Sequence, residues 1–147
     1  MAETLRGRAL LPGAGEGELV VLDEPLSFWG GLDPADGRVI DARHPQAGTV
    51  VAGKVLAMPS GRGSSSSSSV LAEATRAGTA PVAILLGEPD AIVALGAAVA
   101  AELYDLRVPV AVLSPEAIRA LPDGGLAEVE AGDREAVVRL PEGGSVR

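Results

Sequence analysis

The chain has 147 residues, of which 47% are hydrophobic, and a formal net charge of −8 from 20 acidic and 12 basic residues. This length fits a single domain over residues 1–147, with a core mainly of Ala, Val and Leu because aromatic residues make up only 2%. The acidic balance argues against nucleic-acid binding, which needs a basic face. Since the chain has no cysteine, it holds neither a disulfide nor a thiolate-bound metal cluster of its own.

The predicted elements alternate between strand and helix in the middle of the chain, and both ends are rich in strands. Strands are expected at residues 5–11, 18–22, 38–41, 50–58, 81–86, 108–113, 126–130 and 136–140. Helices are expected at 70–77, 91–103 and 115–121, with Asp90 and Ser114 as N-caps and Gly78 as the terminating glycine. This order predicts an α/β domain with a mixed sheet and flanking helices.

The most informative segment connects the strand at 50–58 to the helix at 70–77. It reads Met58-Pro59-Ser60-Gly61-Arg62-Gly63 and continues with six serines at residues 64–69. A Gly-rich turn that opens a helix directs backbone N–H groups and the positive end of the helix dipole toward one place. We therefore expect an anionic substrate group there. The alternatives are a flexible serine linker or a simple helix cap, but the apolar segments that bound the run closely favour a site.

Several separate motifs, in the same order along the chain, resemble the aconitase X swivel domain. They are Asp23-Glu24-Pro25-Leu26-Ser27-Phe28-Trp29-Gly30-Gly31-Leu32-Asp33, His44-Pro45, Gly61-Arg62-Gly63-Ser64-Ser65-Ser66, Gly78-Thr79-Ala80-Pro81, and Gly96-Ala97 with Glu102-Leu103-Tyr104. They extend from about residue 7 to residue 113. The resemblance implies the swivelling β/β/α fold of the fourth domain of aconitase, and the predicted order of elements agrees with it.

The resemblance also implies roles for the residues of the turn. Ser64 takes the place of the catalytic serine, which removes the proton α to a carboxylate. Ser65 and Ser66, with the backbone of Gly63, are expected to bind the substrate carboxylate. Arg62 is expected either to pair with that carboxylate or to face a partner subunit. N–H groups, a helix N-terminus and an arginine are the features that stabilise a serine alkoxide.

A Lewis acid that assists the leaving hydroxyl is an iron–sulfur cluster in this superfamily. Because the chain has no cysteine, the resemblance implies that a large partner subunit holds the cluster and that the two chains form a heterodimer or a larger assembly. No metal is expected on this chain alone. The expected function is therefore the small subunit of a hydro-lyase that acts on a small carboxylate.

The family includes two activities, and the sequence favours the bacterial one. The motif that ends in Phe28-Trp29-Gly30-Gly31 and the uninterrupted serines favour a cis-3-hydroxy-L-proline dehydratase, with phosphomevalonate dehydratase as the alternative. A non-catalytic swivel module that binds an anion, and an interaction protein in which the serines form a linker, are the other hypotheses. The N-terminal residues lack the apolar core of a signal peptide, so a soluble, cytoplasmic protein is expected.

Four other residues or pairs invite a functional reading. His44, the single histidine, precedes a proline and is interpreted as a turn residue. The Phe28-Trp29 pair is typical of a core, but the double glycine after it leaves as the alternative a loop that lines a cleft or a partner interface. Asp23 and Glu24 are adjacent and point apart on an extended chain, which argues against an acid pair. Glu73 and Arg76 have the spacing of an ion pair on an exposed helix face.

Overall fold

The computed structural model describes residues 3–61 and 66–140, and within them seven strands close into a barrel. Around the barrel the order is β1, β7, β6, β5, β2, β8, β9, with β9 pairing again with β1. The bounds are β1 (Glu3–Leu11), β2 (Gly13–Val21), β5 (Val55–Met58), β6 (Ala83–Leu86), β7 (Val110–Val112), β8 (Leu126–Ala131) and β9 (Glu135–Leu140).

The barrel mixes two strand directions. Strands β2, β5, β6 and β7 are mutually parallel, whereas β1, β8 and β9 pair antiparallel with their neighbours. The parallel strands end at one edge of the barrel, which we call the carboxyl edge. Four connections start there, after Val21, Met58, Leu86 and Val112. This edge is where open α/β sheets usually place a ligand.

Alternate side chains of the short central strands belong to two separate cores. In β5, Val55 and Ala57 pack inside the barrel with Leu85 of β6, whereas Leu56 and Met58 pack outside it. All four residues of β5 are fully buried, as expected for strands that are covered on both faces. The barrel and the layer of helices outside it therefore share these strands.

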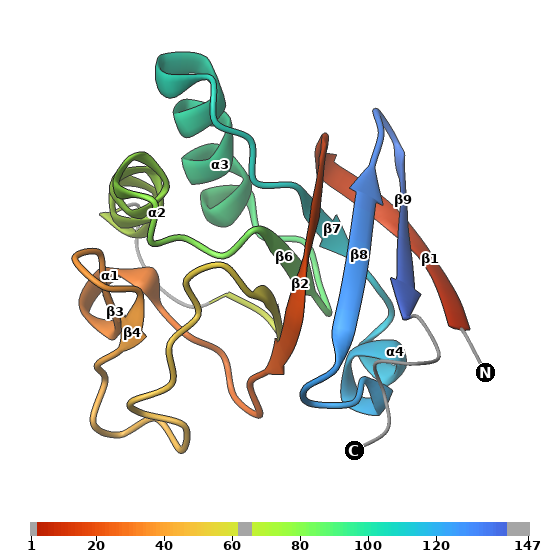
Figure 1. The fold of residues 1–147 in the computed structure, drawn as a ribbon, viewed down its shortest axis with the longest axis horizontal. Helices are drawn as coiled ribbons and strands as arrows, with labels where there is room; N and C mark the ends of the chain where they lie inside the picture. The colour runs from red at the N-terminus through yellow and green to blue at the C-terminus, as the bar shows by residue number, and fades with distance from the viewer. Residues whose placement is uncertain (1–2, 62–65, 141–147) are drawn as a thin grey trace.

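Two helices form the outer layer, and a third closes the carboxyl edge. Helix α2 (Ser66–Ala77) packs along α3 (Ala91–Tyr104), on one side of the barrel, and the short segments α1 (Phe28–Gly31), β3 (Leu32–Asp33) and β4 (Arg38–Val39) lie next to α2 (Figure 1). Helix α4 (Pro115–Ala120) follows β7 and inserts Ile118 into the inner core. The mixed α/β fold predicted from the sequence is confirmed.

Local signals predicted the ends of several elements correctly. The Asp90 side chain accepts hydrogen bonds from the N–H groups of Ile92 and Val93, at 2.9 and 3.0 Å, and Ser114 caps α4 in the same way. Gly78 follows α2 with a φ of +80°, in the left-handed region that favours glycine. The two strands expected at 126–130 and 136–140 also form, and they pair as a C-terminal hairpin.

Several boundaries differ from the prediction, and three of these differences are the largest. Helix α2 begins at Ser66 instead of residue 70, because the last four serines continue into the helical turn. Strand β5 begins at Val55, and the preceding residues form turns. The gap between the strands expected at 5–11 and 18–22 shrinks to Pro12, because β2 starts at Gly13 and pairs with β8 along its first six residues. Pairing with a distant strand decides this last boundary.

The close contact between α2 and α3 depends on Gly96. A Cβ atom there would lie 2.8 Å from the carbonyl oxygen and 3.0 Å from the Cα of Ser68, so no rotamer change relieves the overlap. Alanine gains about 1 kcal/mol in helix propensity over glycine. Overpacking against a backbone costs about 1–3 kcal/mol.

We expect Gly96→Ala to destabilise the domain, with a lower midpoint in denaturant unfolding, because the packing cost exceeds the gain in propensity. Gly132→Ala is the matched control: the nearest atom to its Cβ would be 3.6 Å away, which is ordinary contact. The control should change the free energy of unfolding by less than about 0.5 kcal/mol. Equal stability of Gly96→Ala and the wild type would contradict the tight helix contact.

Candidate functional site

Three connections meet at the carboxyl edge beside the serine turn. The segment after β2 runs next to the turn after β5, where Leu26 forms a parallel bridge with Gly61. The N–H of Gly87, after β6, donates to the carbonyl oxygen of Pro59 at 3.0 Å. The Asp23–Asp33 motif and the serine turn, far apart in sequence, are therefore neighbours in the fold.

Gly61 brings the turn against the start of α3. A Cβ at this position would overlap the Asp90 carboxylate and lie 3.2 Å from Cγ2 of Val93. The Asp90 side chain is already engaged as the N-cap of α3. The backbone of the turn thus passes over a capped helix end at a distance that only glycine permits.

The start of α2 is tied to the segment after β2 by side-chain hydroxyls. Ser67 is 3% exposed, and its Oγ lies 3.3 Å from the N–H of Trp29 and 3.2 Å from Oγ of Ser27. The Ser27 hydroxyl donates to the carbonyl oxygen of Trp29 at 3.0 Å. Ser67 therefore contacts both sides of the turn that carries Trp29.

Trp29 stands at the corner of a tight turn. The dihedral angles are −75° and 119° at Trp29 and 78° and −12° at Gly30, which are those of a type II β-turn with glycine at its third position. Phe28, on one side of the corner, is buried in the outer core, whereas the Trp29 side chain is 60% exposed. The loop is anchored by its phenylalanine and presents its indole to the surroundings.

His44 is buried and forms a hydrogen bond with the segment that follows β2. Its side chain is 6% exposed; Nδ1 accepts a hydrogen bond from the N–H of Gln46 at 3.0 Å, and Nε2 lies 3.1 Å from the carbonyl oxygen of Glu24. The first contact fixes the proton on Nε2, which donates to that carbonyl. The histidine thus lies in a turn, as interpreted from the sequence, and both of its ring nitrogens contact the backbone. Asp23 and Glu24 are both exposed.

Of the predicted site residues, only one lies within the described part of the chain. Ser66 is the exposed first residue of α2. Arg62, Gly63, Ser64 and Ser65 lie outside the described residues, so their roles stay predictions. The contacts of Ser27 and Ser67 were not predicted: nothing local distinguishes Ser67 from the other serines of the run.

A carboxyl group near the serine run has a shifted pKa and belongs to an ion pair on α2. On the exposed face of α2, hydrogen bonding to Arg76 lowers the pKa of the Glu73 carboxyl, and the predicted pair forms at 3.0 Å. Among residues 3–61 and 66–140, no cluster of His, Asp or Glu side chains has the arrangement of a metal site. In the same ranges, no helix is long and apolar enough to span a membrane.

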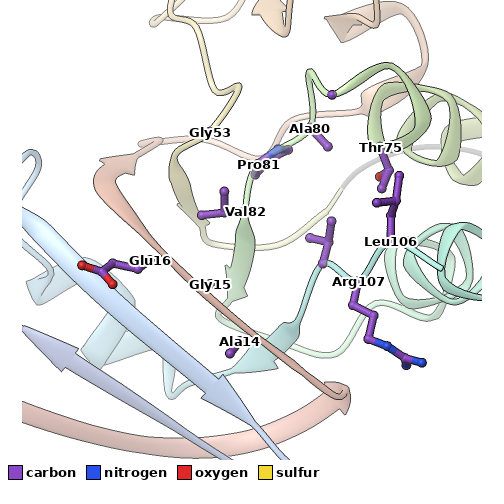
Figure 2. Close-up of a pocket in the computed structure, with 12 residues that line it drawn as sticks. Ala14, Gly15, Glu16, Gly53, Thr75, Ala80, Pro81, Val82, Leu106 and Arg107 are labelled. Atoms are coloured by element: carbon purple, nitrogen blue, oxygen red, sulfur yellow. The ribbon is translucent and has the colours of Figure 1, made fainter. Parts of the chain in front are cut away.

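A separate pocket of about 330 Å³ lies at the opposite edge of the barrel. Its lining includes Gly53, Val82 and Val108, each of which precedes a parallel strand, together with Thr75. Figure 2 shows the side chains of Glu16 and Arg107 on opposite sides of the pocket, so its charged groups do not converge on one ligand. The pocket is too far along the strands to belong to the serine turn.

The sequence pattern of the aconitase X swivel domain matches residues 4–139. The chain belongs to this family. A solved structure of aconitase X from Thermococcus kodakaraensis, in its holo-form, superposes with a TM-score of 0.80 at 36% identity, covering 92% of this chain and 98% of the other. The swivel fold expected from the sequence is therefore confirmed.

Two curated relatives of this swivel domain bear different names. The cis-3-hydroxy-L-proline dehydratase of Pseudomonas aeruginosa is 52% identical over 106 residues, which are 72% of this chain and 18% of that protein. The phosphomevalonate dehydratase small subunit of Thermococcus onnurineus is 45% identical over 127 residues, 86% of this chain and 98% of that one. The swivel domain thus corresponds to a small part of one relative and to nearly all of the other.

Gly61→Ala should lower the stability of the swivel domain, since the new methyl group displaces either the turn or the Asp90 cap. Loss of an N-cap costs about 1 kcal/mol. The second substitution Asp90→Ser keeps a capping oxygen but removes the carboxylate that the methyl group meets. We expect the double variant to unfold at a higher temperature than Gly61→Ala alone. If the double variant lost as much stability as Gly61→Ala and Asp90→Ser lose together, this would argue against the contact between Gly61 and the Asp90 carboxylate.

Proposed function

We propose that this domain is the small subunit of an aconitase X-type hydro-lyase, whose active site it completes together with a large subunit. One observation supports this most: the Asp23–Asp33 motif and the serine turn, both parts of the family resemblance, come together at the carboxyl edge through the Leu26–Gly61 bridge. Two relatives named as dehydratases support the same reaction class.

In this proposal Ser64 is the base that removes the proton α to the substrate carboxylate. The Ser64 alkoxide takes up the proton, the C–H electron pair forms the new C=C bond, and the β-hydroxyl leaves as hydroxide, which becomes water by taking up a proton from solvent. The backbone of Gly63, the hydroxyls of Ser65 and Ser66 and the start of α2 hold the carboxylate, with Arg62 as its counter-charge. A serine gives up its proton only where such donors stabilise the alkoxide.

The residues of this chain do not suit an iron–sulfur cluster. The sequence has no cysteine, and the described residues offer no cluster of alternative ligands. We therefore assign the cluster, and with it the assistance to the leaving hydroxyl, to the large subunit. This chain would supply the base and the groups that bind the carboxylate, both from the carboxyl edge of its barrel.

The substrate proposed first is cis-3-hydroxy-L-proline, on the basis of the 52% identity with the Pseudomonas protein of that name. Phosphomevalonate is the second candidate, favoured by the longer alignment with the Thermococcus small subunit, over 127 residues. Both compounds are β-hydroxy carboxylates, so the same base and the same carboxylate contacts serve either one. They differ in their remaining groups: one has a ring amine bonded to the α-carbon, and the other has a phosphate.

A non-catalytic module that binds an anion at the same turn is the alternative from another class. It would share the helix start and the hydroxyls of α2 but would not need Ser64 as a base. The interaction protein with a serine linker is disfavoured, because residues 66–69 are helical and Ser67 is buried.

The decisive test is reconstitution with the large subunit from the same genome, under anaerobic conditions with iron and sulfide. We expect dehydration of one of the two substrates, and a fall in kcat of about 10²–10⁴-fold in Ser64→Ala, the range for loss of a general base. The complex should still form, because a single hydroxyl is removed.

Ser69→Ala is the matched control, since Ser69 belongs to the same run of six serines, is exposed on α2 and has no proposed role in the reaction. It should keep the wild-type rate. Full activity of Ser64→Ala would exclude Ser64 as the base. An intact, cluster-loaded complex that dehydrates neither substrate would favour the anion-binding module.

A further inference from the structure

The hydrogen bonds between Ser27, Trp29 and Ser67 form a closed ring whose direction is determined. A hydroxyl has one proton to donate. Because the Ser27 hydroxyl donates to the carbonyl oxygen of Trp29, its oxygen accepts from Ser67 across the 3.2 Å contact. Ser67 in turn accepts from the N–H of Trp29 at 3.3 Å. The ring therefore starts and ends on the backbone of one residue.

This ring joins two segments that differ in their anchoring. On one side, the type II turn is held in the outer core by Phe28, next to Trp29. On the other side is the first turn of α2, made of serines, which have low helix propensity. Ser67 is buried in the contact between them. The hydroxyl of Ser67 thus fixes the first turn of α2 against an anchored loop.

We propose that Ser67, through Ser27, is a positioning residue for the hydro-lyase reaction: the ring fixes the direction in which α2 starts and hence the orientation of the carboxylate contacts at Ser66. This inference rests on the proposed function. Ser67 does not touch the substrate; it acts through the start of the helix. A misplacement of reacting groups by about 1 Å can cost about 10²-fold in rate, so a ring of this kind affects kcat strongly.

A merely structural role would also stabilise the fold, so stability alone does not test the proposal. Both Ser27 and Ser67 are placed where removal of a hydroxyl leaves partners without a bond, which is destabilising in itself. Two quantities distinguish a positioning role from a structural one. They are the mobility of the turn that carries Trp29, and whether a substitution changes kcat or KM.

Trp29 is the single tryptophan of the chain, so its fluorescence reports directly on the ring. The first experiment records the fluorescence anisotropy of the full chain without its partner, for the wild type and for Ser67→Ala, Ser27→Ala and Ser69→Ala. We expect a lower anisotropy in the first two variants and an unchanged value in Ser69→Ala. Circular dichroism verifies that each variant is folded.

The second experiment measures kcat and KM in the complex with the large subunit. Ser67→Ala should lower kcat by about 10- to 100-fold with little change in KM, and Ser27→Ala by a similar factor, because each variant removes two of the three hydrogen bonds of the ring. The double variant should resemble Ser67→Ala, since one opening already breaks the ring. Ser27→Thr keeps the hydroxyl on an extended backbone and should restore the rate.

The outcomes separate this inference from the proposed function. Lower anisotropy with an unchanged kcat would overturn the positioning role, and so would unchanged anisotropy in both alanine variants. If Ser67→Ala does not fold, Ser27→Ala, at the less buried of the two serines, is measured for anisotropy and kcat in its place. A wild-type complex that dehydrates neither substrate would overturn the proposed function and the positioning role with it, while the anisotropy differences would still identify the ring.

Discussion

The parallel pairing of β5 with β2 on one side and β6 on the other is the constraint on which the rest of the domain depends. It places the connections after Val21, Met58 and Leu86 at one edge, although 65 residues separate the first of these strand ends from the last. The close neighbours that result are the Asp23–Asp33 motif, the serine turn and the cap of α3. Without this pairing, none of the contacts that define the edge would form.

Two close backbone contacts near the carboxyl edge are possible only because the residues there are glycines. Gly61 lets the turn pass over the Asp90 cap, and Gly96 lets α3 approach the backbone of Ser68. Both contacts act on α2: one limits where the chain enters the helix, and the other limits how far the helix stands from α3. The direction of the first turn of α2 is therefore set by backbone contacts as well as by side chains.

Sequence reasoning predicted the features that local chemistry decides. The caps at Asp90 and Ser114, the glycine at the end of α2 and the C-terminal hairpin all follow from residues close together in the chain. Closure of the barrel was not predicted, because the antiparallel pairing of β1 with both β7 and β9 joins the two ends of the chain. For the same reason Ser67 was indistinguishable from its neighbours: its partners come from a segment about forty residues earlier, which only the fold brings near.

The serines at the start of α2 present a conflict between local preference and tertiary contact. Serine competes with the helix by bonding to nearby backbone, so four in succession weaken the first turn. Here the hydroxyl of Ser67 is engaged instead with Ser27 and the backbone of Trp29, and the turn remains helical. A chain selected only for a stable helix would place alanine or glutamate at these positions. Hydroxyl side chains at the start of a helix are the pattern expected if this edge binds an anion.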